Sequence, residues 1–159
     1  MAVVIRLYRP EDLPRLKEIT VEAFEGVSID RNIEQTFGRV GDRDWGWRKA
    51  RHVEADARRY PAGIFVAEVD GRVAGYISTW IDRESRVGHI PNLALTAADR
   101  GRGIGRRLIE RALSHFRTAG LAVARIETLD QNSVGQRLYP SLGFVEVARQ
   151  IHYAMSLEP

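Results

Sequence analysis

The sequence predicts a mixed α/β fold in a single domain over residues 1–159, with a central sheet of about six to seven strands flanked by about four to five helices. Strand-like apolar runs alternate with segments of helical spacing, above all in the second half of the chain. A length of 159 residues suits one domain with one compact core. No repeat, linker or low-complexity stretch marks a domain boundary.

The first half of the chain begins with an expected strand over residues 3–8 and continues as helices. Arg9-Pro10-Glu11-Asp12 is typical of a helix entry, because proline suits the first turn and acids favour its positive end. The helix that follows is expected to end at Gly26, and further helices are expected near residues 31–37 and 44–59.

The strongest hairpin signal lies in residues 63–81. Apolar and β-branched runs flank Val69-Asp70-Gly71-Arg72, and Asp-Gly favours a two-residue turn. A further strand near residues 86–95 is interrupted by Pro91, which cannot donate a backbone hydrogen bond. Pro91 therefore marks an edge, a bulge or a splay between strands.

The second half alternates helix and strand. An apolar stripe predicts a helix that begins at the glycine-rich turn and ends at Gly120, followed by a strand over residues 121–129 and a helix over 132–141. Residues 144–148 and 150–156 then predict a hairpin that closes the chain.

Composition narrows the class of protein. With no cysteine, the chain can have no disulfide framework, cysteine-ligated zinc or thiol nucleophile. The first apolar run is too short for a signal peptide, and no run approaches the roughly 20 residues of a membrane span, so we expect a cytoplasmic protein with no membrane contact. A net charge of +3 with dispersed basic residues does not indicate a specific nucleic-acid partner.

The stretch from Asn92 to Leu108 has the composition of an anion-binding turn. Its glycines at 101, 103 and 105 lack a Cβ, so an anion can lie against the main chain. The first turn of the following helix adds unpaired N–H groups and the positive end of the helix dipole. The arginines at 100, 102, 106 and 107 can each grip phosphate oxygens with two N–H groups. A phosphate or pyrophosphate is the expected ligand.

Spacing separates the glycine-rich motifs that bind such anions. A P-loop needs Lys and then Ser or Thr after its last glycine, whereas Arg106 follows Gly105. A dinucleotide fingerprint starts directly at the strand end, but residues 96–100 intervene here, although Glu127 could imitate its ribose-binding acid. A helix entry with glycines for packing alone is a further alternative.

The segment Arg100-Gly-Arg-Gly-Ile-Gly105 matches an Arg/Gln-x-x-Gly-x-Gly/Ala signature, through which the sequence resembles the GNAT superfamily of acetyl-CoA-dependent N-acetyltransferases. In that superfamily a helix, a strand and an Asn…Leu-Tyr-x-x-x-Gly-Phe segment follow the signature, as they do here from Asn132 to Phe144. The resemblance covers roughly residues 87–148, while residues 27–60 match no motif of the family. It implies a GNAT-like fold and direct transfer of an acetyl group to a primary amine in a ternary complex.

The resemblance also implies how acetyl-CoA, the expected cosubstrate, is held; no metal is expected. The pyrophosphate would lie on the amides of residues 101–106, and the pantetheine arm would run along residues 93–95 as an extra strand. Asn132 would bind from the opposite side, or serve only as the N-cap of its helix. The implied cofactor-binding residues are Leu93, Ala94, Leu95, Arg100, Gly101, Arg102, Gly103, Ile104, Gly105, Arg106 and Asn132.

Three residues are candidates for the proton transfers. Tyr139 occupies the position of a family tyrosine that donates to the leaving sulfur, although it could be only a core aromatic. Glu127 lies where the ribosomal-protein N-acetyltransferases place a base, with an exposed strand acid as the alternative. His89 lies where histone-type enzymes carry a glutamate, with a merely half-buried histidine as the alternative.

The sequence does not choose the acceptor, which could be a protein N-terminus, a lysine, a polyamine or an antibiotic amine. Trp45, Trp47 and nearby acids could form a wall for a cationic amine, or belong to the core and the solvated surface. Alternatives to an enzyme are a non-catalytic acetyl-CoA-binding module and a dinucleotide- or nucleic-acid-binding domain. The oligomeric state is open, with a homodimer among the options.

Overall fold

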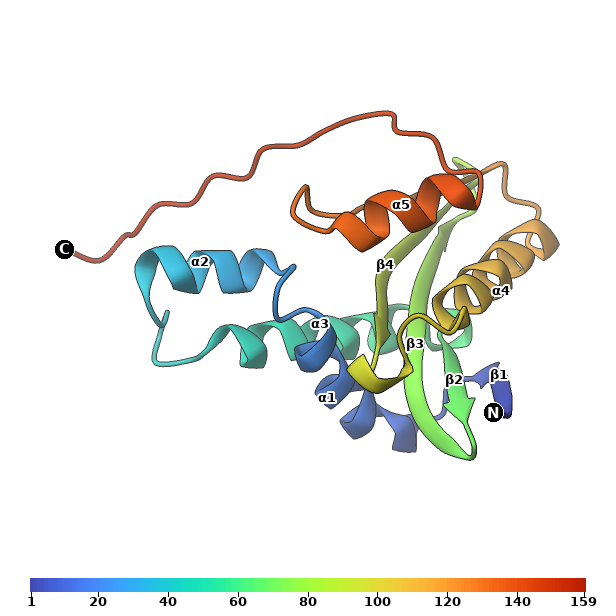
Figure 1. The fold of residues 1–159 in the computed structure, drawn as a ribbon. Helices are drawn as coiled ribbons and strands as arrows, with labels where there is room; N and C mark the ends of the chain where they lie inside the picture. Colours follow the sequence, from blue (N-terminus) through green and yellow to red (C-terminus); the bar gives the residue numbers. More distant parts are fainter.

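The protein, described over residues 1–159 by a computed structural model, folds as a five-stranded mixed sheet with helices on both faces (Figure 1). The strands lie in chain order, and every neighbouring pair is antiparallel except β4 and β5, which are parallel. The strands are β1 (Val3–Leu7), β2 (Phe65–Val69), β3 (Arg72–Asp82), β4 (Val87–Leu95) and β5 (Val123–Ile126). The α-helices are α1 (Leu13–Ala23), α2 (Ile29–Phe37), α3 (Trp45–Arg59), α4 (Ile104–Thr118) and α5 (Ser133–Ser141).

The central strands are buried on both faces, which explains their continuous apolar runs. Alternate residues of β2 enter different cores: Phe65 packs with α4, whereas Val66 packs with α1 and α3. In the second core the buried Tyr76 hydroxyl lies 2.6 Å from Thr20 Oγ1, so its polar group is satisfied. The sheet is thereby held rigidly between two layers of helices.

Local chemistry explains where the elements begin and turn. Asp70 and Gly71 both have positive φ, at 50° and 80°, as a two-residue type I′ hairpin turn requires. The side chains of Ser28 and Asp44 accept hydrogen bonds from the first turns of α2 and α3, as helix N-caps do. None of the helices is long and apolar enough to cross a membrane.

The expected helices, the hairpin and the first four expected strands are confirmed. The strand expected over residues 121–129 is shorter and spans Val123–Ile126. The expectation of six to seven strands is wrong, because residues 144–148 and 150–156 form no hairpin. Two-residue hairpin turns favour glycine, asparagine or aspartate, and none of these occurs between residues 144 and 158.

Close packing between β3 and β4 gives a prediction for stability. Gly75 lies opposite Leu95, and a Cβ at Gly75 would lie 2.6 Å from the carbonyl oxygen of Ala94, which cannot move without shifting the strand. Gly75→Ala should therefore lower the free energy of unfolding by about 1–3 kcal/mol, measured by urea titration. Gly26→Ala is the matched control, because a Cβ there meets nothing within 4 Å. Equal stability of the two variants would contradict the packing described.

Candidate active site

The sheet opens in the middle of β4. β4 pairs with β5 only from Val87 to Ile90, and the register against β3 shifts between Ser78 and Trp80. Pro91 therefore lies both in a bulge and at the point where β5 diverges, as its missing N–H allows. Beyond it, the edge of Leu93, Ala94 and Leu95 that faces β5 has no strand partner.

The glycine-rich turn lies at the open end of β4. Gly101 and Gly103 have φ of 75° and 77°, and Gly103 caps α4 with no side-chain hydrogen bond. The backbone N–H groups from Gly101 to Arg106 find no acceptor in the protein. Because these donors are unpaired and lie at the positive end of the α4 dipole, the turn is suited to an anion.

A buried carboxylate fixes this turn to the sheet. Asp99, fully buried, accepts hydrogen bonds of 2.8 and 2.9 Å from the Arg72 guanidinium of β3 and a further one from Thr96. The hydrogen bonds from Arg72 and then Thr96 lower the pKa of Asp99 to about 2. Asp99 was not predicted as part of the site, because nothing in the sequence indicates that it meets Arg72.

The arginines around the turn have different partners. Arg106 donates to Ser141 of α5 at 2.9 Å, and Arg107 donates to the Val3 carbonyl of β1. Arg102 lies 3.6 Å from Asp99. The exposed Arg100 side chain makes no hydrogen bond and is free to contact a ligand.

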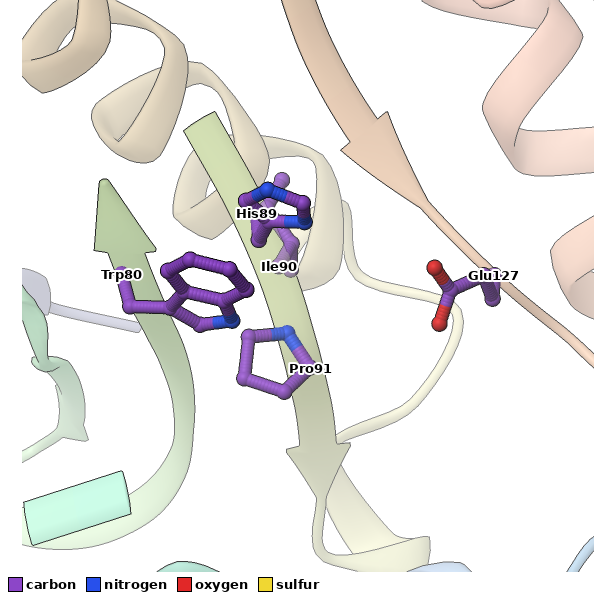
Figure 2. A pocket seen from close by; sticks show the side chains of 5 residues that line it. All are labelled: Trp80, His89, Ile90, Pro91 and Glu127. Atoms are coloured by element: carbon purple, nitrogen blue, oxygen red, sulfur yellow. The ribbon is translucent and has the colours of Figure 1, made fainter. Parts of the chain in front are cut away.

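A cavity of about 110 Å³ lies where β4 and β5 diverge (Figure 2). Two of its lining residues, His89 and Glu127, are predicted site residues. The other three are Trp80, Ile90 and Pro91, which were not predicted to be part of the site. Trp80 comes from β3, His89 from β4, and Glu127 directly follows β5, with its carboxylate turned toward the other strands. The structure thus brings both candidate bases to one cavity.

The surroundings of His89 favour its neutral form. Its ring stacks on Trp80 with centroids 3.7 Å apart and planes 1° from parallel, and Arg59 covers the same indole. Burial lowers the pKa of His89, and Arg125 lowers it further. A lone pair on the ring is therefore available at neutral pH. Trp80 gave no sequence signal, since only the strand register places it beside His89.

Glu127 differs from His89 in its exposure. Its side chain is 75% exposed, and Arg125 of β5 lies 3.4 Å from its carboxylate. A carboxylate in this position can accept a proton directly or through water.

Helix α5 carries Tyr139 and begins at Asn132. The Tyr139 ring lies edge-on to Phe144, and its hydroxyl makes no hydrogen bond within the protein. Burial raises the pKa of Tyr139, so the phenol keeps its proton at neutral pH. Tyr139 does not line the cavity. Asn132 accepts from Gly135 and donates to Thr128, so it is an N-cap with one amide N–H left over.

A polar network behind the opening was not predicted. Lys49 of α3 donates to Asn92 Oδ1 at 3.0 Å, Asn92 donates to Asp56 at 2.6 Å, and Ser78 donates to the same carboxylate at 2.7 Å. Burial lowers the pKa of Lys49. The network joins α3 to β3 and to the part of β4 that does not pair with β5.

The aromatic and acidic wall suggested by the sequence does not line the cavity. The ring of Trp47 contacts the guanidinium groups of Arg43 and Arg51, at 4.5 and 4.8 Å from its centroid. Asp44 serves as the N-cap of α3. Trp47 and Asp44 instead line a separate hollow of about 390 Å³ between α1 and α3.

Comparison with known proteins places this geometry among acetyltransferases. The model of the acetyltransferase (GNAT) family matches residues 15–144. An uncharacterized N-acetyltransferase of Methanocaldococcus jannaschii is 36% identical over 143 residues, covering 89% of this chain and 78% of that protein. The mycothiol acetyltransferase of Thermomonospora curvata is 30% identical over 164 residues, covering 95% of this chain but 54% of that protein. The chain thus spans about half the length of this relative.

The same architecture occurs in solved structures. The PaiA N-acetyltransferase of Thermoplasma acidophilum, determined in complex with coenzyme A, superposes with a TM-score of 0.73 at 23% identity. The match covers 91% of both chains. At this identity the similarity establishes the fold.

Proposed function

Since the chain belongs to the GNAT acetyltransferase family, we propose that it transfers an acetyl group from acetyl-CoA directly to a primary amine. One observation carries the proposal: a row of unpaired N–H groups over residues 101–106 follows directly on an unpaired edge of β4. A ligand that joins a pyrophosphate to an extended amide-containing arm is complementary to both features at once.

The residues around the turn suit the two parts of that ligand. The amides from Gly101 to Arg106 would hold the pyrophosphate, with the exposed Arg100 and Arg102 beside them. The free edge of residues 93–95 would hydrogen-bond the pantetheine arm, and the remaining N–H of Asn132 would donate from α5. When bound, acetyl-CoA supplies a thioester whose acyl carbon an amine can attack.

The acceptor amine must lose a proton before it attacks. At pH 7 this costs about 4.6 kcal/mol for a lysine amine and about 1 kcal/mol for an α-amine. Glu127 is the proposed base, because its carboxylate reaches the cavity from the exposed side where an acceptor would enter. Neutral His89 lies in the same cavity and is the proposed second acceptor of the proton.

The sulfur that leaves the acyl carbon needs a proton donor. Tyr139 fits this role because its hydroxyl is protonated and unpaired. A phenol with a pKa near 10 can hydrogen-bond a thiolate whose own pKa is near 8.5 as the carbon–sulfur bond breaks.

A direct test measures thiol release from acetyl-CoA in the presence of peptides with free N-termini, lysine peptides, polyamines and aminoglycosides. We expect release matched by an acetylated amine in the mass spectrum for at least one class. Binding of acetyl-CoA without release for any amine would indicate a non-catalytic module, and no binding at all would overturn the proposal.

Tyr139→Phe removes the proposed proton donor without removing the ring. It should lower kcat about 100-fold, while the Kd for acetyl-CoA, measured by calorimetry, stays unchanged. Tyr8→Phe is the control, since Tyr8 lies beyond the end of β1 and away from the cavity. Unaltered turnover of Tyr139→Phe would remove Tyr139 from the mechanism.

The two candidate bases are separated by matched amide substitutions. Glu127→Gln should lower kcat about 100-fold or more, whereas His89→Gln should lower it less than about 10-fold. Because the His89 pKa lies below its usual value, the loss of rate from protonating His89 appears only below about pH 6.5, and His89→Gln should abolish that loss. Glu110→Gln on the exposed face of α4 is the control. The opposite ranking of the first two variants would assign the base to His89.

A further inference from the structure

A row of side chains crosses the sheet beside the cavity. Trp80 of β3 pairs in register with His89 of β4, and His89 pairs in register with Arg125 of β5. Residues paired in this way lie side by side on one face of a sheet. Arg59, the last residue of α3, lies over the indole of Trp80, with its guanidinium carbon 4.9 Å from the ring centroid. The row therefore joins two arginines to the two stacked rings.

Arg59 has no partner of opposite charge. Its side chain is exposed and makes neither an ion pair nor a hydrogen bond. A guanidinium held against an aromatic face keeps its N–H groups, which lie in its own plane, free to donate. The protein itself supplies no acceptor for this fork of donors.

The acids near the row are already in use. Asp82 accepts backbone hydrogen bonds of 3.1 Å from two residues of the turn that follows β3. Glu127 lies 3.4 Å from Arg125 and is the proposed base, so it must remain free to take a proton. The positive charge of Arg59 is therefore not balanced by any carboxylate of the chain.

Both arginines act on the cavity that His89 lines. Burial lowers the pKa of His89 first, and Arg125 and Arg59 lower it further. Glu127 and Asp82 act on the imidazole in the opposite sense. A negatively charged group of an acceptor would be attracted to Arg59, whereas a second positive charge would be repelled there.

The distance from the cavity to Arg59 suits a short acceptor. The path crosses one stacked pair of rings, those of His89 and Trp80, whose centroids are 3.7 Å apart (Figure 2). One residue of an extended chain spans about 3.3–3.6 Å. An acceptor whose amine lies in the cavity therefore reaches Arg59 with a group that is one to three residues away from that amine.

We propose that Arg59, assisted by Arg125, binds a carboxylate of the acceptor, so that the preferred acceptor is an amine with a carboxylate one to three residues away. This inference rests on the acetyl transfer proposed above and names the class of its acceptor. The carboxylate can come from an acidic side chain near the N-terminus of a peptide or from the free carboxyl end of a very short peptide. Either source offers two oxygens that match the guanidinium fork.

Matched peptides test the carboxylate and its source. Three amidated tripeptides share an N-terminal serine and continue with two glutamates, two glutamines or two lysines, and a fourth is the glutamine peptide with a free carboxyl end. We expect kcat/KM, from thiol release, to be about 10-fold higher for at least one carboxylate-bearing peptide than for the amidated glutamine peptide, mainly through KM. The glutamate and free-acid peptides distinguish a side-chain from a terminal carboxylate.

Substitutions of Arg59 test which residue reads the carboxylate. Arg59→Gln should abolish the preference, whereas Arg58→Gln is the control, because it removes a neighbouring exposed arginine of the same helical turn. Arg59→Glu should reverse the preference and favour the lysine peptide over the glutamate peptide. A loss of structure alone would lower all the rates and would not reverse a preference.

The outcomes separate this inference from the proposed function. Equal kcat/KM for the four peptides, or a preference that survives Arg59→Gln, would overturn the inference and leave the acetyl transfer standing. Acetylation confined to amines without a carboxylate, such as polyamines, would also overturn this inference alone. Acetylation of none of these peptides and of no other amine would overturn both.

Discussion

The divergence of β5 from β4 after Ile90 is the constraint on which the rest of the site depends. Pro91 removes one backbone donor at that point, and the bulge in β4 turns the following residues to a new register against β3. The unpaired edge and the cavity between the strands both follow from this break, and the glycine turn lies at the end of the unpaired edge. A continuous ladder would fill the space with backbone hydrogen bonds and leave no place for a ligand.

Where β5 diverges from β4, the sheet loses backbone hydrogen bonds. Buried side-chain hydrogen bonds on either side of this opening compensate for the loss. Asp56 receives hydrogen bonds from Ser78 and Asn92, which join α3 to β3 and β4 where β5 is absent. Asp99 accepts hydrogen bonds from the Arg72 guanidinium and from Thr96, and these bonds fix the start of the glycine turn to β3. Both carboxylates are buried, both accept hydrogen bonds from more than one side chain, and neither lines the cavity. The fold thus leaves the backbone N–H groups of residues 101–106 free to bind a ligand.

Local patterns in the sequence predicted most of the fold, and they predicted the glycine turn with unpaired N–H groups before α4. Helical spacing, the Asp70-Gly71 turn and the glycines before α4 each act over a few residues, and each element formed where expected. Trp80 beside His89 depends on strand register, and Asp99 beside Arg72 depends on a contact across 27 residues, so neither could be inferred from spacing. The prediction of a closing hairpin over residues 144–148 and 150–156 was wrong for a related reason. Alternation of apolar and polar residues predicts a strand, but a turn or a neighbouring strand edge decides what that strand pairs with.

The cavity explains why the sequence alone could not choose between the two candidate bases, His89 and Glu127. Burial and Arg125 lower the pKa of His89, whereas Glu127 raises it, so the protonation of the imidazole depends on the carboxylate across the cavity. Glu127 is exposed to solvent and His89 is half-buried against Trp80, so a proton accepted at the carboxylate can leave to water more directly. This difference in solvent access is the physical reason to propose Glu127, and not His89, for the first proton transfer.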